Sequence, residues 1–155
     1  MTASPETWMR EALDEARIAA TEDEVPVGAV VVRNDEILAR DHDRRTALRD
    51  PTAHAEILAL REAARRVGDW RLEGCDLYVT LEPCAMCAGA ILLARIETLC
   101  FGAANPKFGA VGSRFNVLDD HGWNHRVNVI AGILAGQCAA LLSEYFRNKR
   151  ADERD

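Results

Sequence analysis

Three potential metal ligands and one carboxylate lie at the starts of two predicted helices. His54 and Glu56 open one helix, and Cys84 and Cys87 open another, directly after Pro83. Two cysteines three positions apart on a first helical turn point their sulfur atoms the same way, and the backbone N–H groups there favour thiolates. Together with one imidazole they supply the three protein ligands of a tetrahedral zinc site whose fourth position is open.

The expected chemistry of such a site is the activation of water. Zinc held by these ligands would lower the pKa of a water molecule toward neutrality and produce a hydroxide nucleophile. Glu56 stands two residues after His54, so we expect it near the metal without binding it, where it can move protons. A Cys-x-x-Cys pair alone also occurs as half of a structural zinc site or as a redox pair, and a lone histidine is more often a satisfied polar group. The sequence holds no second Cys-x-x-Cys, and the combined pattern favours a catalytic zinc site.

The elements that must position these residues alternate along the chain. The capping and periodicity signals predict helices over 4–20, 52–67, 83–94 and 134–147. Predicted strands cover 25–32 and 37–39, joined as a hairpin by Asn34-Asp35, then 77–81, 98–101 and 127–130. We expect loops over 40–51 and over the glycine-containing stretch 102–124. Four side chains of the second helix are expected to face inward: Ile57, Leu58, Leu60 and Ala64. This alternation predicts a mostly parallel sheet with helices on both faces.

Length and charge limit the remaining possibilities. The 155 residues correspond to one domain, with about 151–155 as a short polar tail, and 48% hydrophobic and 28% charged residues argue against disorder. The net charge of −6 is unevenly spread, because residues 1–60 hold 7 basic and 13 acidic side chains whereas residues 95–150 hold 7 and 4. A basic coat over the whole protein is excluded, whereas a local cationic face in the C-terminal part is compatible with this distribution.

Cysteine usage and hydropathy predict a reduced cytoplasmic protein. No apolar run approaches the roughly 18 residues that span a bilayer, and the acidic first twenty residues lack a signal-peptide pattern. The five cysteines are an odd number without secretory context, which favours metal binding over a disulfide framework. Cys75, Cys100 and Cys138 are expected to be small buried apolar residues.

The His-x-Glu and Pro-Cys-x-x-Cys pair is typical of zinc nucleobase deaminases. The sequence resembles the bacterial tRNA-specific adenosine deaminases over roughly residues 6–150. The matching stretches are 24–30 (EVPVGAV), 50–56 (DPTAHAE), 72–75 (LEGC), 78–91 (YVTLEPCAMCAGAI), 124–127 (NHRV) and 138–142 (CAALL).

The resemblance implies a fold, an activity and a site. It implies an α/β class fold, a cytidine-deaminase-like three-layer α/β/α sandwich around a five-stranded mixed sheet, in a homodimer. It also implies conversion of the wobble adenosine of a tRNA anticodon to inosine with release of ammonia. Carried over to this chain, one zinc ion per subunit would be bound by His54, Cys84 and Cys87, and Glu56 would be the general acid and base. Val27 would line the base pocket, and the Ala55 backbone N–H would help to hold the flipped base.

The same resemblance implies contacts with the anticodon stem-loop. In the family they come from the loop after the fourth strand and from the C-terminal helix. The corresponding positions here are Asn105, Pro106, Lys107, Phe146, Arg147, Lys149 and Arg150. Lys107, Arg147 and Arg150 among them, with Arg126, suit phosphate binding. Phe146 suits stacking beside a base. For each basic residue, ordinary solvated surface charge is the alternative, and for Phe146 a place in the core.

Two departures from the family pattern bear on the substrate. Asp43 stands where the family usually has a base-contacting asparagine, and Asn105 stands where it usually has aspartate. An ionised aspartate only accepts hydrogen bonds, whereas asparagine also donates them. A deaminase of a free base or small aminoheterocycle such as guanine is therefore the alternative enzyme. A zinc-stabilised RNA-binding module without catalysis would have no need of Glu56.

Overall fold

The computed structural model describes residues 2–154. The elements along them are α1 (Pro5–Thr21), β1 (Gly28–Arg33), β2 (Glu36–His42), α2 (Arg45–Leu48), α3 (Ala55–Val67), β3 (Asp76–Leu81), α4 (Ala85–Leu93), β4 (Thr98–Ala103), β5 (Asn128–Ala131) and α5 (Ala135–Arg154). The predicted succession is confirmed, with α2 as an addition inside the stretch predicted to be a loop. Residues 151–154, expected to form a polar tail, are helical and continue α5.

The short helix α2 depends on a distant carboxylate. Glu24 is buried, and its two carboxylate oxygens accept hydrogen bonds from the backbone N–H groups of Thr46, at 3.0 Å, and Ala47, at 2.8 Å. These N–H groups have no partner inside the first turn of a helix. The local sequence alone therefore does not indicate α2, because its cap comes from a residue more than twenty positions earlier.

The five strands form one sheet in the order β2-β1-β3-β4-β5. β1 pairs antiparallel with both β2 and β3, whereas β3, β4 and β5 run parallel. The implied mixed sheet is confirmed, and the strands that follow the hairpin are parallel, as the alternation with helices predicts; both antiparallel pairings involve β1. The cause is the hairpin. Its turn residues Asn34 and Asp35, both with positive φ, reverse the chain. β1 therefore lies between β2 and β3 and is antiparallel to both.

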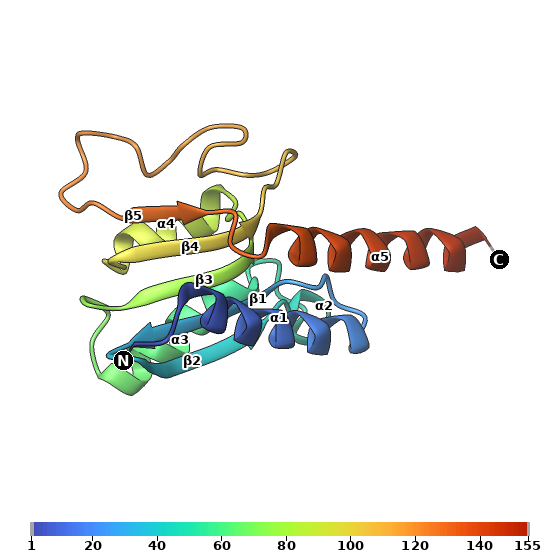
Figure 1. Ribbon diagram of the computed structural model, residues 1–155, viewed down its shortest axis with the longest axis horizontal. Helices are drawn as coiled ribbons and strands as arrows, with labels where there is room; N and C mark the ends of the chain where they lie inside the picture. The colour runs from blue at the N-terminus through green and yellow to red at the C-terminus, as the bar shows by residue number, and fades with distance from the viewer. Residues whose placement is uncertain (1, 155) are drawn as a thin grey trace.

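Helices cover both faces of this sheet, which confirms the three-layer sandwich (Figure 1). α1 and α5 lie against one face, and α3 and α4 lie against the other. β1 is buried on both sides, because Ala29 and Val31 join the core on the α3 and α4 side while Val30 and Val32 join the core on the α1 and α5 side. This two-sided burial explains the continuous β-branched run in the sequence. No helix within residues 2–154 has both the length and the apolar character to cross a membrane.

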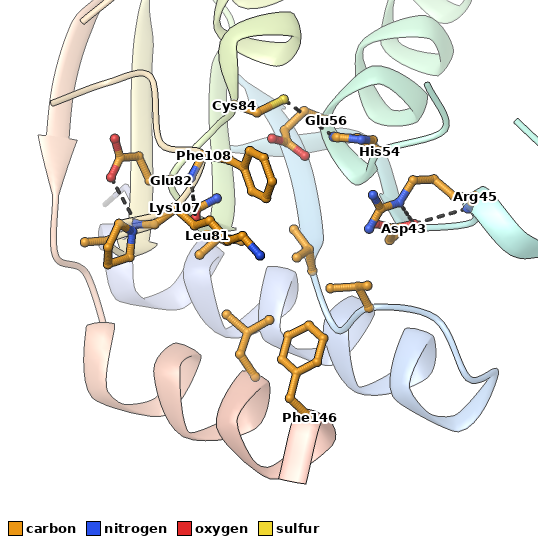
Figure 2. Close-up of a pocket in the computed structure, with 16 residues that line it drawn as sticks. Asp43, Arg45, His54, Glu56, Leu81, Glu82, Cys84, Lys107, Phe108 and Phe146 are labelled. Atoms are coloured by element: carbon orange, nitrogen blue, oxygen red, sulfur yellow. Dashed lines mark hydrogen bonds and ion pairs between the residues drawn. The ribbon is translucent and has the colours of Figure 1, made fainter. Parts of the chain in front are cut away.

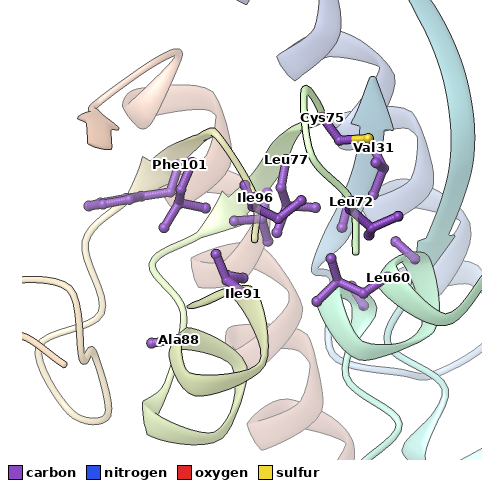
Figure 3. Packing of buried hydrophobic residues seen from close by; sticks show 14 of the residues in the cluster. Val31, Leu60, Leu72, Cys75, Leu77, Ala88, Ile91, Ile96 and Phe101 are labelled. Carbon is purple, nitrogen blue, oxygen red and sulfur yellow. The ribbon is translucent and has the colours of Figure 1, made fainter. Parts of the chain in front are cut away.

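The larger core lies between the sheet and helices α3 and α4 (Figure 3). Leu77, Ile91 and Ile96 are fully buried there, and burying each side chain of this size contributes about 1.5–3 kcal/mol. On the opposite face α1 approaches β1 so closely that a Cβ on Gly28 would lie 2.0 Å from the Ala12 carbonyl oxygen. Only glycine fits at this contact.

The inward face of α3 differs from the one predicted. The buried residues are Ala55, Glu56, Ala59, Leu60 and Ala63. Of the four residues predicted to face inward, Leu60 is buried, and the other three are only partly covered. The small alanine side chains allow α3 to pack closely on the sheet. With this face of the helix turned inward, Glu56 is buried near the ends of the strands.

Candidate metal and active site

The three predicted metal ligands come together at the starts of α3 and α4. His54 is the residue that precedes the first turn of α3, and Cys84 has the same place before α4, with Cys87 inside that helix. The Nδ1 atom of His54 lies 3.5 Å from the Sγ of Cys87 and 3.7 Å from the Sγ of Cys84. All three ligand atoms lie within 4.8 Å of one another.

This donor set fits a tetrahedral zinc ion. Ordinary Zn–N and Zn–S bonds place a nitrogen and a sulfur ligand about 3.6 Å apart, close to the separations between His54 and the two cysteines. The Cys87 thiol and its backbone N–H hydrogen bond to the Cys84 sulfur and, together with His54, lower the pKa of Cys84 to about 3. A lowered pKa favours the thiolate form of Cys84, which is the form that binds metals.

Glu56 lies beside the ligand group and is not part of it. Its carboxyl group is buried, and burial raises the pKa of Glu56 to about 7. Figure 2 shows Glu56, His54 and Cys84 together at one end of a cavity of about 600 Å³. A buried carboxyl group that titrates near neutrality suits a general acid and base.

A second cluster of potential ligands, Glu15, Asp41 and His42, is already occupied by ion pairs. The ring nitrogens of His42 lie 3.0 Å from Glu15 and 2.7 Å from Glu22, and the other Glu15 oxygen accepts from Arg40 at 3.0 Å. These contacts fasten β2 to α1. The cluster therefore has a structural explanation, which leaves the group around His54 as the candidate metal centre.

The cavity gathers side chains from six separate parts of the chain. Of the predicted substrate and RNA residues, six line it: Val27, Asp43, Asn105, Pro106, Lys107 and Phe146. Ala55 is fully buried and does not line the cavity, and Arg147 is exposed on α5 and does not line it either. Residues that the sequence analysis missed also line the cavity: Val25, Arg45, Leu81, Glu82, Ala104, Phe108 and Leu142.

The carboxylate of Asp43 is fully engaged by its neighbour Arg45. Its Oδ1 accepts from the backbone N–H and from Nε of Arg45, each at 3.1 Å, and its Oδ2 lies 3.0 Å from Nη2. Asp43 is buried, whereas the Arg45 side chain reaches the mouth of the cavity. No residue of the family motif signals this pair, because it arises from the turn between β2 and α2.

A second buried carboxylate, Glu82, organises the loop that carries Asn105 and Lys107. Its oxygens accept from the backbone N–H groups of Asn105, Val111 and Ser113 and from the Ser113 hydroxyl. Burial alone would raise the pKa of Glu82, but these hydrogen bonds outweigh it and lower the pKa. Gly109 lies against the same carboxylate, and a Cβ there would meet Glu82 Cδ at 2.5 Å.

The remaining predicted RNA residues have different surroundings. The Lys149 ammonium pairs with both oxygens of Asp23, at 2.9 and 2.8 Å, and this fixes α5 to the end of α1. Arg126 donates to His121 at 2.7 Å, whereas Arg147 and Arg150 are exposed.

The three cysteines outside the candidate metal site, Cys75, Cys100 and Cys138, are buried, as predicted.

Comparison with known proteins decides the family. The model of the MafB19-like deaminases matches residues 3–150. A curated relative, the tRNA-specific adenosine deaminase of Bacillus subtilis (strain 168), is 48% identical over 145 residues, which cover 94% of this chain and 90% of that protein. The chain belongs to the family of tRNA-specific adenosine deaminases.

Solved structures agree with the assignment to this deaminase family. A structure from studies of A-to-I editing by tRNA:A34 deaminases has a TM-score of 0.85 and 46% identity, covering 88% of this chain and 99% of that chain. The guanine deaminase from Nitrosomonas europaea has a TM-score of 0.78 and 29% identity, covering 94% of this chain and 86% of that chain. The α/β fold with a five-stranded mixed sheet is therefore that of the deaminases.

Proposed function

We propose that this chain is a zinc-dependent hydrolase that converts the wobble adenosine of a tRNA anticodon to inosine and releases ammonia. The observation that carries the proposal is the buried Glu56 beside His54, Cys84 and Cys87 at the end of an open cavity. The family membership of the chain supports the choice of substrate. Each turnover consumes one water, which adds its oxygen to C6 of adenine while the amino group departs.

The proposed role of Glu56 is to move the protons. One zinc ion per subunit, held by His54, Cys84 and Cys87, would supply the activation of water near neutral pH. Glu56 takes a proton from the attacking water and places it on the ring nitrogen next to C6, and it later protonates the departing amine. A carboxyl group with a pKa of about 7 both accepts and donates at neutral pH.

Residues that line the cavity are proposed to bind the flipped base. Val27 provides an apolar wall, and Phe108 and Phe146, both more than two-fifths exposed, offer faces for stacking. The Ala55 backbone N–H is in the first turn of α3, where such groups have no partner within the helix. We assign this N–H to the base, as the family resemblance implies.

The anticodon stem-loop is the proposed partner of the basic residues on the loop after β4 and on α5. Asn105 and Lys107 lie on the loop that Glu82 holds, and Phe146 faces the cavity from α5. Arg147 and Arg150 extend the same helix outward and are exposed. The basic side chains Lys107, Arg147 and Arg150 would bind phosphates without reading sequence. Since tRNA modification takes place in the cytoplasm, we place the protein there.

A homodimer is the proposed assembly. α4 is apolar around most of its surface: Cys87, Ala88 and Ile91 face the core, yet Leu93 is 67% exposed and Met86 37% exposed. A helix that is apolar all round is normally covered on all sides. A second copy of the chain, packed on this exposed side of α4, would lie directly beside the metal centre.

Ammonia release by the purified zinc-loaded protein tests the proposal. The substrates are an anticodon stem-loop with adenosine at the wobble position, a matched stem-loop with guanosine there, and free adenine, adenosine and guanine. We expect turnover of the adenosine stem-loop only, with inosine as its product. Turnover of guanine and none of the stem-loop would refute the proposal and favour an activity like that of the Nitrosomonas europaea guanine deaminase.

A further inference from the structure

Arg45 is the charged side chain at the cavity that the family motifs leave without a role. It lies at the start of α2, and its guanidinium is held by Nε and Nη2 against the two oxygens of Asp43. The side chain of Asp43 is only 4% exposed and that of Arg45 is 39% exposed. The pair is thus anchored below the surface and open at its outer end.

The pairing determines which partners this corner of the cavity accepts. A guanidinium carries five N–H donors and no acceptor, and its hydrogen bonds within residues 2–154 all go to Asp43. The N–H groups on the far side remain free for a ligand. Because both oxygens of Asp43 face the guanidinium, the corner presents donors and suits an acceptor or an anion rather than the N–H groups of guanine.

The backbone that carries Arg45 is fixed. Glu24 holds the next two residues of α2 by their backbone N–H groups, and the backbone N–H of Arg45 itself donates to Asp43. A guanidinium that is already oriented loses little conformational entropy when it binds an anion.

Arg45 also stands opposite the cation that the family resemblance places on RNA. Figure 2 shows Arg45 on one side of the cavity and Lys107 on the other, with the metal ligands and Glu56 between them at the inner end. A nucleotide whose base enters between these side chains has a phosphate on each side of its ribose. A cation on each side of the opening therefore matches an internal nucleotide of a chain better than a free base.

We propose that Arg45, held in place by Asp43, binds a phosphate adjoining the target nucleotide, on the side of the cavity opposite Lys107. This inference rests on the proposed function, since it needs a polynucleotide substrate. It makes Asp43 a positioning residue that acts through the guanidinium. It also places a phosphate contact in the acidic N-terminal part of the chain, where residues 1–60 carry a net charge of −6.

The direct test replaces Arg45 by alanine and uses the neighbouring arginine as control. Arg44 has a similarly exposed side chain, pairs with Asp41 at 3.7 Å and does not line the cavity. For the zinc-loaded Arg45→Ala variant we expect the Kd and KM of the adenosine stem-loop to rise about tenfold, with kcat nearly unchanged. The log–log salt slope of binding should fall by about 0.7, whereas Arg44→Ala should match the wild type. A Kd and slope unchanged in Arg45→Ala would overturn the proposal.

The position of the phosphate is tested with a neutral methylphosphonate, placed in turn on the 5′ and on the 3′ side of the target adenosine. Wild type should lose affinity at both positions, and Arg45→Ala should lose nothing further at one of them. If Arg45→Ala were as sensitive as wild type at both, the guanidinium would have no phosphate partner there, and the proposal would be wrong.

A double variant tests the positioning role of Asp43. Asp43→Ala should raise Kd in the same direction as Arg45→Ala, and the double variant should bind no more weakly than Arg45→Ala alone. An additive loss would show that Asp43 touches the substrate itself. The binding measurements also separate this inference from the proposed function: a wild type that binds but does not deaminate the stem-loop refutes the reaction and leaves the Arg45 contact to be judged by Kd.

Discussion

The backbone N–H of Val111 donates a 3.0 Å hydrogen bond to the buried carboxylate of Glu82, 29 residues earlier in the chain. Glu82 stands two residues before the proposed metal ligand Cys84, and Val111 belongs to the loop that carries Lys107. One carboxylate thus joins the start of α4, which carries two proposed metal ligands, to the loop proposed to bind RNA.

Removal of this carboxylate should release the loop. Glu82→Ala leaves three backbone N–H groups and the Ser113 hydroxyl without their acceptor, and we expect the free energy of unfolding to fall by about 2–4 kcal/mol. Hydrogen–deuterium exchange should speed up over residues 105–113. Glu73→Gln, at an exposed site, is the control, and unchanged exchange in the loop of Glu82→Ala would contradict the assigned role.

Glu56→Gln should bind zinc and fold but lose turnover. The amide preserves the shape of the side chain and cannot exchange protons as the carboxyl does, so kcat should fall by about 10³-fold or more. Glu62→Gln changes a partly exposed carboxylate of the same helix, which pairs with Arg65 away from the cavity, and should behave as wild type. More than a few per cent of residual activity in Glu56→Gln would rule out its role as proton carrier.

Cys87→Ser should deplete the protein of zinc. Serine replaces a sulfur ligand, 3.5 Å from Nδ1 of His54, by a hydroxyl that binds zinc poorly. Metal analysis of the purified protein should give one zinc ion per subunit for wild type and much less for the variant. Cys75→Ser alters a buried cysteine outside the cluster and should keep its zinc; equal zinc in all three proteins would contradict the assigned ligand.

Three cations of the proposed RNA surface should contribute to the salt dependence of binding. The triple variant Lys107→Ala, Arg147→Ala and Arg150→Ala should bind the stem-loop more weakly, with a log–log salt slope lower by about 0.7 for each phosphate that is no longer neutralised. The control removes three exposed arginines elsewhere, Arg10, Arg61 and Arg65, so that the change in net charge is the same. Equal slopes in the two variants would mean that the first three are ordinary surface charges.

The stability of the fold should depend on the protonation of His42. Burial alone would lower the pKa of His42, but hydrogen bonds to Glu15 and Glu22, with Asp41 nearby, outweigh it and raise the pKa above 6.5. Arg40, on the other oxygen of Glu15, stays charged throughout. Because the folded state holds this proton more tightly than the unfolded chain, its contribution is complete below about pH 6.5 and is lost as the pH rises through the raised pKa.

Urea unfolding at a series of pH values checks this expectation. The free energy of unfolding should decline above neutrality in wild type and decline less in His42→Gln. His121→Gln alters an exposed histidine and should follow the wild type. Parallel pH curves for wild type and His42→Gln would show that the histidine does not carry the effect.

Much of the site was determined by the sequence alone, because short spacings place the ligands. His54 and Glu56 are two residues apart, and Cys84 and Cys87 are three apart, so that a single helix start fixes each pair whatever else the chain does. The hairpin turn at Asn34-Asp35 and the end of α3 at Gly68, with φ of 81°, are local in the same sense. Their conformations follow from the residues that occupy them.

Only the tertiary structure decided which charges face the cavity and which hold the fold together. Asp43 turns to Arg45 at the start of a helix that Glu24 caps from a distance, and Lys149 pairs with Asp23, 126 residues earlier in the chain. Such pairs form between groups that the sheet and its helices bring together, so nothing in the residues beside them reveals the partner. The strand order has the same origin, because the helices that cover both faces of β1 and the strand β3 that pairs with its second edge come from distant parts of the chain.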